Sequence, residues 1–555
     1  MVLHCFLPNN SNLQHKRTFT IPIAWLRTTS FYLPLIFIFE RTANNILSRF
    51  KKENMTKHKT LGQVYTPDWV VNEILDLVNY STAEILTRYI LEPACGDGAF
   101  LKEIVKRYIK EGKNKKLTID EISIGLEKYI YGIELDKIEY EKCLQNLDAI
   151  TNELLGNQKI KWNIFNENTL FQYKKYKSTF DYIVGNPPYI RIHNLDLDTR
   201  DFIKENFCYS EGTIDIYLTF FEMAFYMLKT DGKIGYITPN SYLHNSSYNK
   251  FRDFLKQKKG IEILIDFKAN KIFKGYSTYT AITIIEFNEK RNSFIYKELV
   301  DEKIKTVNNI QFDELDLKGW SFTDKTNEHF LKNLHLDKNT FISELFDVQY
   351  GFATLRDKIF IGKISVFEKN SELVYFNNHL IEKKLLMDCI KGSTYKGKID
   401  ENNKIIFPYK KVSNRYKVIS EDEMKKDYPF CYKYFLSNKE DLMTRDLDKG
   451  AIWYEYGRSQ GVQSMHNEKI VLSTLMNGKI SFYKIPADVL MYSGIFITKK
   501  NPLTDWGVLE NMLSSEEFYQ FIRITGKDFS GGYKSITSKQ IKTFKVYLKN
   551  NNKLF

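Results

Sequence analysis

The ten residues 180–189, FDYIVGNPPY, constrain the fold of this chain more than any other stretch. Residues 182–184 form an apolar run typical of a buried strand. The strand must end near Gly185, because two prolines follow it and proline cannot continue a sheet ladder. Ligands bind at the carboxyl ends of the strands in open α/β sheets, so Asn186 and Tyr189 are predicted to lie at a binding edge.

The chemistry of this turn points to a planar ligand that carries an amino group. Proline has no N–H, so the turn is rich in carbonyl acceptors and poor in donors. Asn186 adds a side-chain carbonyl and Tyr189 adds a flat ring. A nucleobase with an exocyclic amine fits such a site. Taken by itself, the motif is equally compatible with a plain strand followed by a turn.

A second motif, ILEPACGDGAFL at residues 90–101, predicts a strand, a loop of small residues and a helix. Ala94, Gly96 and Gly98 would let a ligand approach the backbone closely. The loop lacks the third glycine of a dinucleotide fingerprint and the lysine of a phosphate loop. It therefore predicts a nucleoside-like ligand.

A third motif, YGIELD at residues 131–136, predicts a short strand that ends in acidic residues. A carboxylate at the end of the second strand of a nucleoside site can accept hydrogen bonds from ribose hydroxyls, and Glu134 is the candidate. Asp136 could serve there too, or it could cap the next helix.

Strands and helices alternate along this part of the chain. That order predicts a mainly parallel sheet with helices on both faces, closed by a late pair of adjacent strands. The expected helices are residues 68–79 and 215–228, and the further strands are residues 234–237, 261–267 and 280–287.

Composition narrows the partners and the compartment. The net charge of +13 and the 36 Tyr and 40 Phe favour a nucleic-acid partner, although a lysine-rich proteome would also yield a basic protein. The six cysteines form no CxxC pair and the sequence contains no HExxH, so we expect neither a disulfide framework nor a metal site. This cysteine usage predicts a cytoplasmic protein.

We divide the chain into four parts. Residues 1–54 have an atypical composition. Their densest apolar stretch is shorter than the roughly 20 residues that a membrane helix needs. No small-residue cleavage site of a signal peptide follows that stretch. We expect the functional protein to start at Met55 and to have no stable membrane association. Residues 55–300 would form the nucleoside-binding domain, the charged residues 301–339 a junction, and residues 340–555 a second domain.

Four motifs, TP at residues 66–67, LEPACGDGAFL, GIELD and FDYIVGNPPY, follow one another in this order. Together they resemble the motifs of the gamma-class DNA adenine-N6 methyltransferases of bacterial restriction–modification systems. The resemblance runs from about residue 61 to residue 287 and continues more weakly to the C-terminus. It implies a Rossmann-like S-adenosylmethionine-dependent methyltransferase domain with a mixed, mainly parallel sheet, followed by a C-terminal α+β target-recognition domain.

The resemblance also implies S-adenosylmethionine as the cofactor. Glu134 would hold its ribose. Where the family usually has an Asp that bonds the cofactor adenine, this chain has Asn168, which accepts a bond without a full charge. The residues expected around the methionine end and the loop are Thr66, Glu92, Ala94, Cys95, Gly96 and Gly98, and Pro188 would border the cofactor and the acceptor site.

For the acceptor site, the resemblance implies that the Asn186 side chain and the Pro187 carbonyl accept hydrogen bonds from the target amine. Tyr189 would stack on one face of an adenine flipped out of duplex DNA. Phe273 matches the position of the residue that stacks on the other face, although its sequence context fits a core phenylalanine nearly as well.

Three later stretches resemble motifs of the family's target-recognition domain: GFATLRDK at 351–358, WYEYGR at 453–458 and FSGGYKSI at 529–536. Arg356, Arg458 and Lys534 are therefore candidates for contacts with phosphates or guanine edges. Solvated loop charge explains each of them about as well.

The sequence thus predicts a monomeric, site-specific adenine methyltransferase that acts on double-stranded DNA, with a cognate restriction endonuclease as a possible separate partner. One alternative is a related enzyme that methylates RNA or protein glutamine, which the large basic C-terminal half disfavours. Another is a bifunctional restriction-modification enzyme, disfavoured because roughly 60 residues before the cofactor motif cannot hold a nuclease domain. A non-catalytic DNA-binding subunit is disfavoured by the complete set of motifs.

Overall fold

The computed structural model describes residues 65–209, 215–273, 278–316, 319–368, 371–529 and 531–548. The expectations for residues 1–54 and for a start at Met55 lie outside the described residues. The Asn186, cofactor-loop and recognition motifs lie within them, except for Ser530 of the last motif.

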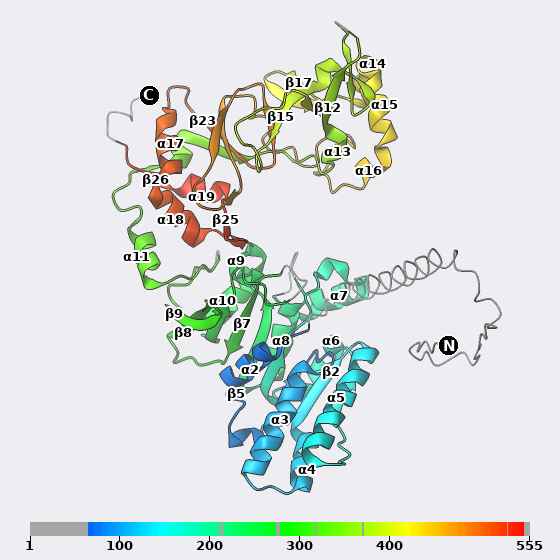
Figure 1. The fold of residues 1–555 in the computed structure, drawn as a ribbon, viewed down its shortest axis with the longest axis vertical. Coiled ribbons are helices and arrows are strands. Elements are labelled where there is room, and N and C mark those ends of the chain that lie inside the picture. The colour runs from blue at the N-terminus through cyan, green and yellow to red at the C-terminus, as the bar shows by residue number, and fades with distance from the viewer. Residues whose placement is uncertain are drawn as a thin grey trace, which may run out of the picture. The chain divides into compact units, whose positions relative to one another are not determined.

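A nine-stranded sheet runs through the first part of the chain, where Figure 1 labels β2, β5, β7, β8 and β9. The strand order is β3-β2-β1-β4-β5-β7-β6-β8-β9. Strands β3, β2, β1, β4 and β5 pair in parallel, and β7 lies antiparallel between β5 and β6. The predicted mainly parallel α/β sheet is confirmed. The late pair of strands, β6 and β7, does not close the sheet as predicted, because β8 and β9 follow it in the strand order. The strands are β1 (Ile90–Glu92), β2 (Ile130–Glu134), β3 (Asn163–Asn166), β4 (Phe180–Gly185), β5 (Leu228–Pro239), β6 (Ile261–Asp266), β7 (Thr280–Ile285), β8 (Ser293–Val300) and β9 (Lys303–Gln311).

Helices cover both faces of this sheet. Gly235 and Tyr236 are successive residues of β5, so their Cα substituents point to opposite faces. A Cβ on Gly235 would lie 2.7 Å from Ile74 of α2, whereas the ring of Tyr236 contacts that of Phe221 of α8 at a centroid distance of 5.2 Å. The helices of this part are α2 (Asp68–Leu77), α3 (Ala99–Asn114), α4 (Ile119–Tyr129), α5 (Lys137–Leu155), α6 (Thr169–Gln172), α7 (Leu197–Asn206), α8 (Tyr217–Met227), α9 (Ser241–His244), α10 (Asn249–Gln257) and α11 (Lys325–Asn333).

Two paired strands, β8 and β9, lie on either side of residue 301, where the charged junction is predicted to begin. Strand β8 lies parallel to β6, and β9 pairs antiparallel with β8 inside the predicted 301–339 junction. Phe294 and Tyr296 are buried while Ile295 between them is 38% exposed. This alternation is typical of a strand with one solvated face, and the charged residues of the stretch obscure it. The division into domains stays a prediction.

The residues from about 340 onward contain strands and helices in α+β arrangement, as predicted. The larger sheets have the orders β11-β23-β19-β21 and β14-β13-β12-β16-β15-β22, and a small sheet has the order β20-β25-β24. Two clusters of buried apolar residues form the cores here. The strands are β10 (Thr340–Phe341), β11 (Phe346–Tyr350), β12 (Ile361–Val366), β13 (Leu373–Phe376), β14 (His379–Glu382), β15 (Leu386–Lys391), β16 (Asn403–Ile406), β17 (Tyr409–Val412), β18 (Arg415–Val418), β19 (Lys469–Leu472), β20 (Leu475–Met476), β21 (Phe482–Ile485), β22 (Leu490–Tyr492), β23 (Ile495–Lys499), β24 (Asp528–Phe529), β25 (Tyr533–Ser535) and β26 (Lys545–Val546). The helices are α12 (Ile342–Leu345), α13 (Asp357–Phe360), α14 (Glu421–Asp427), α15 (Pro429–Ser437), α16 (Lys439–Met443), α17 (Trp506–Ser514), α18 (Glu516–Thr525) and α19 (Ser538–Thr543).

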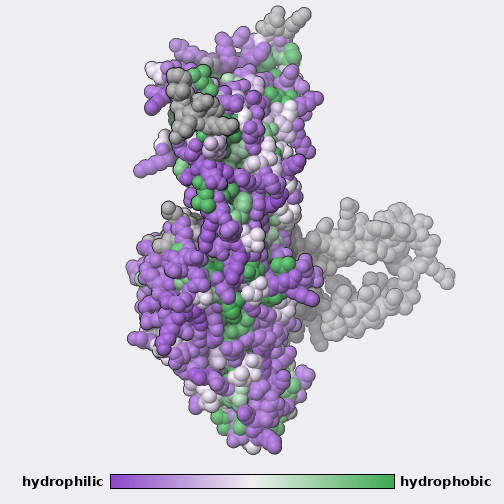
Figure 2. Space-filling model, turned by 90° about the vertical axis from the view of Figure 1, so that its left-hand side faces the viewer, coloured by the Kyte–Doolittle hydropathy of each residue, from purple (hydrophilic) through white to green (hydrophobic). Residues whose placement is uncertain are grey.

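The surface is predominantly polar on the face that Figure 2 presents, where hydrophobic residues occupy small areas among hydrophilic ones. Among the residues that the structure describes, no helix is long and apolar enough to cross a membrane.

Candidate active site

The candidate cofactor loop joins β1 to α3 at the carboxyl edge of the sheet. Gly96 and Gly98 have φ angles of +51° and +86°, in the left-handed region that favours glycine. A Cβ on Gly98 would lie only 2.8 Å from Sγ of Cys143, so a side chain there would clash with the Cys143 side chain. The two glycines thus give the loop its turn and keep its backbone open to a ligand.

Glu134 ties the end of β2 to this loop. Its Oε2 accepts a hydrogen bond from the Gly96 N–H at 2.7 Å, and its Oε1 accepts one from the Asp136 N–H at 2.8 Å. Burial raises the pKa of Glu134, although these two backbone bonds oppose the rise. Each carboxylate oxygen has a second lone pair, so ribose hydroxyls could bond to it as well.

Asp136, which the sequence left open between a ligand and a helix cap, is the N-cap of α5. Its side chain accepts hydrogen bonds from the N–H groups of Ile138 at 2.8 Å and Glu139 at 3.3 Å. These bonds satisfy donors that would otherwise lack partners at the start of the helix.

Glu92 lies beneath both the loop and the acceptor motif. It is 3% exposed, and its Oε2 accepts a hydrogen bond from the Leu101 N–H at 3.3 Å. A Cβ on Gly185 would lie 3.4 Å from its Cγ, so the side chain packs against the end of β4. Burial raises the pKa of Glu92 well above its ordinary value, which favours the neutral acid.

Cys95 offers the loop its backbone rather than its side chain. Its N–H donates to the Ile133 carbonyl at 3.0 Å, and its side chain is 2% exposed. A hydrogen bond with Cys143 raises the pKa of Cys95 well above its ordinary value, and burial adds to the rise. Only the main chain of Cys95 is therefore available for the predicted contact with the cofactor.

Asn168 lies near the same edge, at the start of α6 after β3. Its side chain caps this helix by accepting a hydrogen bond from the Leu170 N–H at 3.0 Å. The Glu167 N–H donates to the Glu134 carbonyl at 3.1 Å, which holds this turn beside the candidate ribose ligand.

Sequence reasoning did not single out two exposed apolar residues beside Glu134. Leu135 is 61% exposed and Ile138 is 55% exposed. Exposed apolar surface next to a candidate ribose ligand suits a flat, uncharged ring. Leu135 directly follows Glu134 in the GIELD motif. This position next to the candidate ribose ligand was the one signal in the sequence that could have indicated its role.

Asn186 and Thr66 meet at the carboxyl end of β4. The Asn186 side-chain amide donates to Oγ1 of Thr66 at 3.1 Å, and Thr66 is 9% exposed. This bond orients the amide plane of Asn186. It also connects a residue predicted for the cofactor to the residue predicted for the target amine.

The structure brings Tyr189 and Phe273 together. Their ring centroids lie 6.3 Å apart with an interplanar angle of 68°, an edge-to-face contact. The Tyr189 hydroxyl donates to the Ile237 carbonyl at 3.2 Å, and burial raises the pKa of this tyrosine well above its ordinary value. Phe273 is 3% exposed. One ring would have to turn before both could stack on a base between them.

The first two recognition motifs also meet. Ala353 and Arg458 exchange backbone hydrogen bonds at 3.0 and 2.9 Å, and the rings of Phe352 and Tyr456 stack at 4.4 Å with an angle of 16°. The third motif belongs to the separate small sheet β20-β25-β24.

Each predicted DNA-contacting cation already has a carboxylate partner. Arg356 pairs with Asp441, Arg458 with Asp446 and Lys534 with Asp528, each at 2.7 Å. A phosphate would have to compete with these local carboxylates for the three cations.

Comparison with known proteins identifies which family part of this chain matches. Residues 104–273 match the family model described as Eco57I restriction-modification methylase. The match contains the Asn186 motif and Phe273. It confirms the resemblance to restriction–modification methyltransferases.

Two curated relatives agree with this match. The chain is similar to the Type II restriction enzyme and methyltransferase RM.Eco57I of Escherichia coli, with 27% identity over 80% of this chain and 52% of that protein. It is also similar to the Type II methyltransferase M.BstVI of Geobacillus stearothermophilus, with 25% identity over 44% of this chain and 46% of that protein. The chain thus spans about half the length of these relatives.

Among solved structures, the fold is similar to that of the Type IIL restriction-modification enzyme MmeI, determined in complex with DNA. The TM-score is 0.54 at 13% identity, over 90% of this chain and 66% of that one. At this identity the likeness concerns the fold alone.

Proposed function

We propose that this chain is a DNA methyltransferase that transfers a methyl group from S-adenosylmethionine to the N6 amino group of an adenine flipped out of duplex DNA, as the modification enzyme of a restriction–modification system. The observation that carries the proposal is the hydrogen bond between Thr66 and Asn186. It joins the predicted cofactor side and the predicted acceptor side of one edge of the sheet.

The residues at the loop fit S-adenosylmethionine. The open backbone at Gly96 and Gly98, the Glu134 carboxyl group and the exposed Leu135 side chain offer a nucleoside hydrogen-bond acceptors and an apolar surface. When bound, the cofactor would supply an electrophilic methyl group. The neutral acid favoured at Glu92 could donate a hydrogen bond to a carboxylate or accept one from an amine.

The acceptor residues fit an exocyclic amine. The Pro187 carbonyl and the Asn186 side-chain oxygen would accept the two N–H bonds of the amine and direct its lone pair toward the methyl group. Holding reactants in such a geometry lowers the barrier, so a dedicated base is not required before transfer. The nitrogen–methyl bond would form as the carbon–sulfur bond breaks, S-adenosylhomocysteine would leave, and the methylated amine would then release one proton to water. Tyr189 would stack on the flipped base and Phe273 would close its other face, which would offset part of the cost of unstacking.

Duplex DNA is the proposed substrate because of the charge and the relatives. The net charge of +13 suits a polyanion, and the relatives are restriction–modification proteins by name. We propose that the protein acts as a cytoplasmic monomer and that the residues after 340 recognise the target sequence through Arg356, Arg458 and Lys534.

A labelled-methyl assay tests the proposal. The full chain is incubated with isotope-labelled S-adenosylmethionine and, in separate reactions, with unmodified duplex DNA, RNA and bacterial protein extract. We expect label in duplex DNA, recovered as N6-methyladenine after digestion to nucleosides. Label confined to RNA or protein would overturn the DNA assignment, and N4-methylcytosine would overturn the choice of base.

A second candidate function has one observation in its favour. The Escherichia coli relative is named as both a restriction enzyme and a methyltransferase, and this chain covers about half of it. The native protein could therefore cleave DNA as well. Incubation of unmodified DNA with the native protein and Mg²⁺, followed by electrophoresis, distinguishes the two: discrete fragments would support the bifunctional enzyme, and intact DNA would support the methyltransferase alone.

A further inference from the structure

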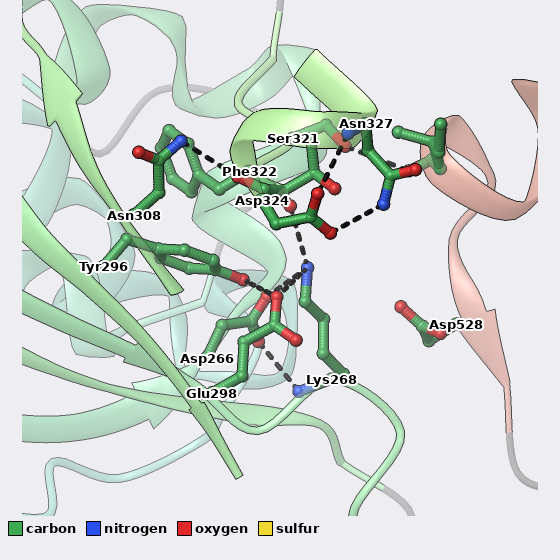
Figure 3. A network of polar contacts seen from close by, with 12 residues as sticks. Asp266, Lys268, Tyr296, Glu298, Asn308, Ser321, Phe322, Asp324, Asn327 and Asp528 are labelled. Atoms are coloured by element: carbon green, nitrogen blue, oxygen red, sulfur yellow. Dashed lines mark hydrogen bonds and ion pairs between the residues drawn. The ribbon is translucent and has the colours of Figure 1, made fainter. Parts of the chain in front are cut away.

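Phe273 of the acceptor site lies at the end of a segment that follows β6. This segment begins at a buried cluster of charged residues, Asp266, Lys268 and Glu298 (Figure 3). Strand β6 ends at Asp266, which is 1% exposed. Oδ1 of Asp266 accepts hydrogen bonds from the Asn240 side chain at 2.9 Å and from the Lys268 N–H at 3.0 Å. Asp266 therefore fixes the direction in which the chain leaves the sheet.

Lys268 itself has a φ angle of +50°, a conformation that residues other than glycine rarely adopt. Such a backbone persists only where its surroundings hold it. The next turn is held as well, since the Asn270 N–H donates to the Phe267 carbonyl at 2.8 Å.

The Lys268 side chain supplies that hold by turning back onto the sheet. Its Nζ lies 3.3 Å from Oε1 of Glu298 and 3.6 Å from Oδ2 of Asp266, and it donates to the Phe322 carbonyl at 3.3 Å. It also lies 5.4 Å from the ring centroid of Tyr296, whose hydroxyl donates to Glu298 at 2.6 Å. Figure 3 shows the ammonium group between these partners.

Charge keeps Lys268 in this place. Burial disfavours the ammonium form, but the carboxylates of Asp266, Glu298 and Asp528 together outweigh it and raise the pKa of Lys268 above its ordinary value. Removing the cation would leave Asp266 and Glu298 with hydrogen bonds but without the positive charge of Lys268, and would loosen the first turn of the segment.

The opposite side of the segment contacts the helix that follows Thr66. The ring of Phe267 packs edge-on against Trp69 of α2 at a centroid distance of 5.9 Å. Thr66 precedes α2 and bonds to Asn186. The segment from Phe267 to Phe273 is thus held between the Lys268 cluster and the residues that orient Asn186.

We propose that Lys268 is a positioning residue that holds residues 267–273 so that Phe273 faces Tyr189 and can stack on the target base. The proposal rests on the proposed methyltransferase function. Lys268 acts through Phe273 and does not itself contact the base.

The test compares Lys268→Gln, the charge-conserving Lys268→Arg and the control Lys271→Gln, which removes an exposed lysine from the same segment. Amide hydrogen exchange is measured on peptides that cover residues 267–273 and on the rest of the protein. In Lys268→Gln we expect exchange to increase in this segment alone.

For methyl transfer to unmodified duplex DNA we expect kcat to fall on the order of tenfold, because misplacement of a positioning group lowers the rate. The KM for S-adenosylmethionine should stay within about twofold, since uniform binding of the cofactor is unaffected. Lys268→Arg should recover most of kcat, and Lys271→Gln should match the wild type.

Two results would overturn the role of Lys268. One is equal kcat and equal exchange in Lys268→Gln and Lys271→Gln. The other is a uniform increase of exchange throughout the protein together with a lower melting temperature, which would mark a purely structural role. If Lys268→Gln does not fold, Glu298→Gln replaces it. That variant weakens the shorter of the two ion pairs of Lys268, with Glu298 at 3.3 Å, while Asp266 still neutralises the ammonium group. We then expect a smaller increase of exchange in the same segment and a smaller fall in kcat, and unchanged exchange and kcat would overturn the proposal.

Failure of the proposed function gives a different outcome. In that case the wild type itself transfers no methyl group to DNA, and the exchange contrast between Lys268→Gln and Lys271→Gln alone decides whether the cluster holds the segment.

Discussion

The side-chain amide of Asn186 donates a hydrogen bond to the hydroxyl of Thr66 across 3.1 Å, although the two residues are 120 positions apart. Thr66 precedes the first described helix and Asn186 follows β4. Because the bond uses the amide N–H, it determines which way the Asn186 carbonyl oxygen is directed. The proposed cofactor side and acceptor side of the site therefore depend on each other.

Replacing Asn186 with alanine tests the acceptor site. We expect methyl transfer to fall at least about 100-fold, because the variant loses an acceptor that orients the target amine. Cofactor affinity, measured by calorimetry, should stay close to that of the wild type. Asn114→Ala removes an exposed amide and is the control. Normal turnover in Asn186→Ala would contradict the mechanism.

Replacing Thr66 with valine tests the coupling between the two sides. The variant keeps the shape of the side chain but removes the hydrogen-bonding oxygen. We expect a loss of about 1 kcal/mol, which corresponds to a fall of roughly fivefold in kcat. Thr66→Ser keeps the hydroxyl and should retain activity. Steady-state kinetics on duplex DNA measure both, and the idea fails if valine and serine behave alike.

Glu92 makes a prediction about pH. Its folded-state pKa lies above the ordinary value of 4.5, so the folded protein holds this proton at pH values where the unfolded chain has lost it. Stability from this group is fully present below pH 4.5 and declines as the pH rises through the folded pKa.

Glu92→Gln cannot ionise, so its melting temperature relative to the wild type should increase as the pH rises above 4.5. Thermal melts at fixed ionic strength measure this difference. Glu103→Gln, which changes a partly exposed glutamate of α3, is the comparison. A difference that is constant over the pH range would show that burial does not hold Glu92 as the neutral acid.

Arg458 and Asp446 make opposite predictions for DNA binding. If Arg458 contacts a phosphate, Arg458→Ala should weaken duplex binding and reduce the salt slope by about one. Asp446→Asn removes a competing carboxylate and should tighten binding. Fluorescence anisotropy at several salt concentrations measures both, with exposed Arg415→Ala as the control. Weakened binding in both variants would indicate that the ion pair only supports the local structure.

Local signals in the sequence were enough to predict the strands and helices that position the candidate site. The prolines after Gly185 ended β4 where expected, and apolar spacing predicted α2, α8 and the strands β6 and β7 to within a few residues. These signals are local because the covalent limits of proline and the periodicity of burial act within a few residues.

Local sequence signals failed in two situations. Charged residues concealed the apolar alternation of two strands, and one acidic residue was equally suited to bind a ligand or to cap a helix. Strands β8 and β9 carry charged residues on their solvated side, so the apolar alternation did not reveal them as strands. Asp136 suited both a ligand and a cap, and only its bonds to the start of α5 decided for the cap.

The sequence by itself determined the order of the motifs, the ends of the strands that carry them and the kind of ligand that they suit. Only the tertiary structure decided that Asn186 bonds to Thr66, that Tyr189 and Phe273 meet edge to face, that Arg458 pairs with Ala353, and that Lys268 closes a cluster with Asp266 and Glu298. These contacts join segments far apart in the chain. Their geometry depends on how the strands pair across the sheet, which the periodicity of a single segment does not specify.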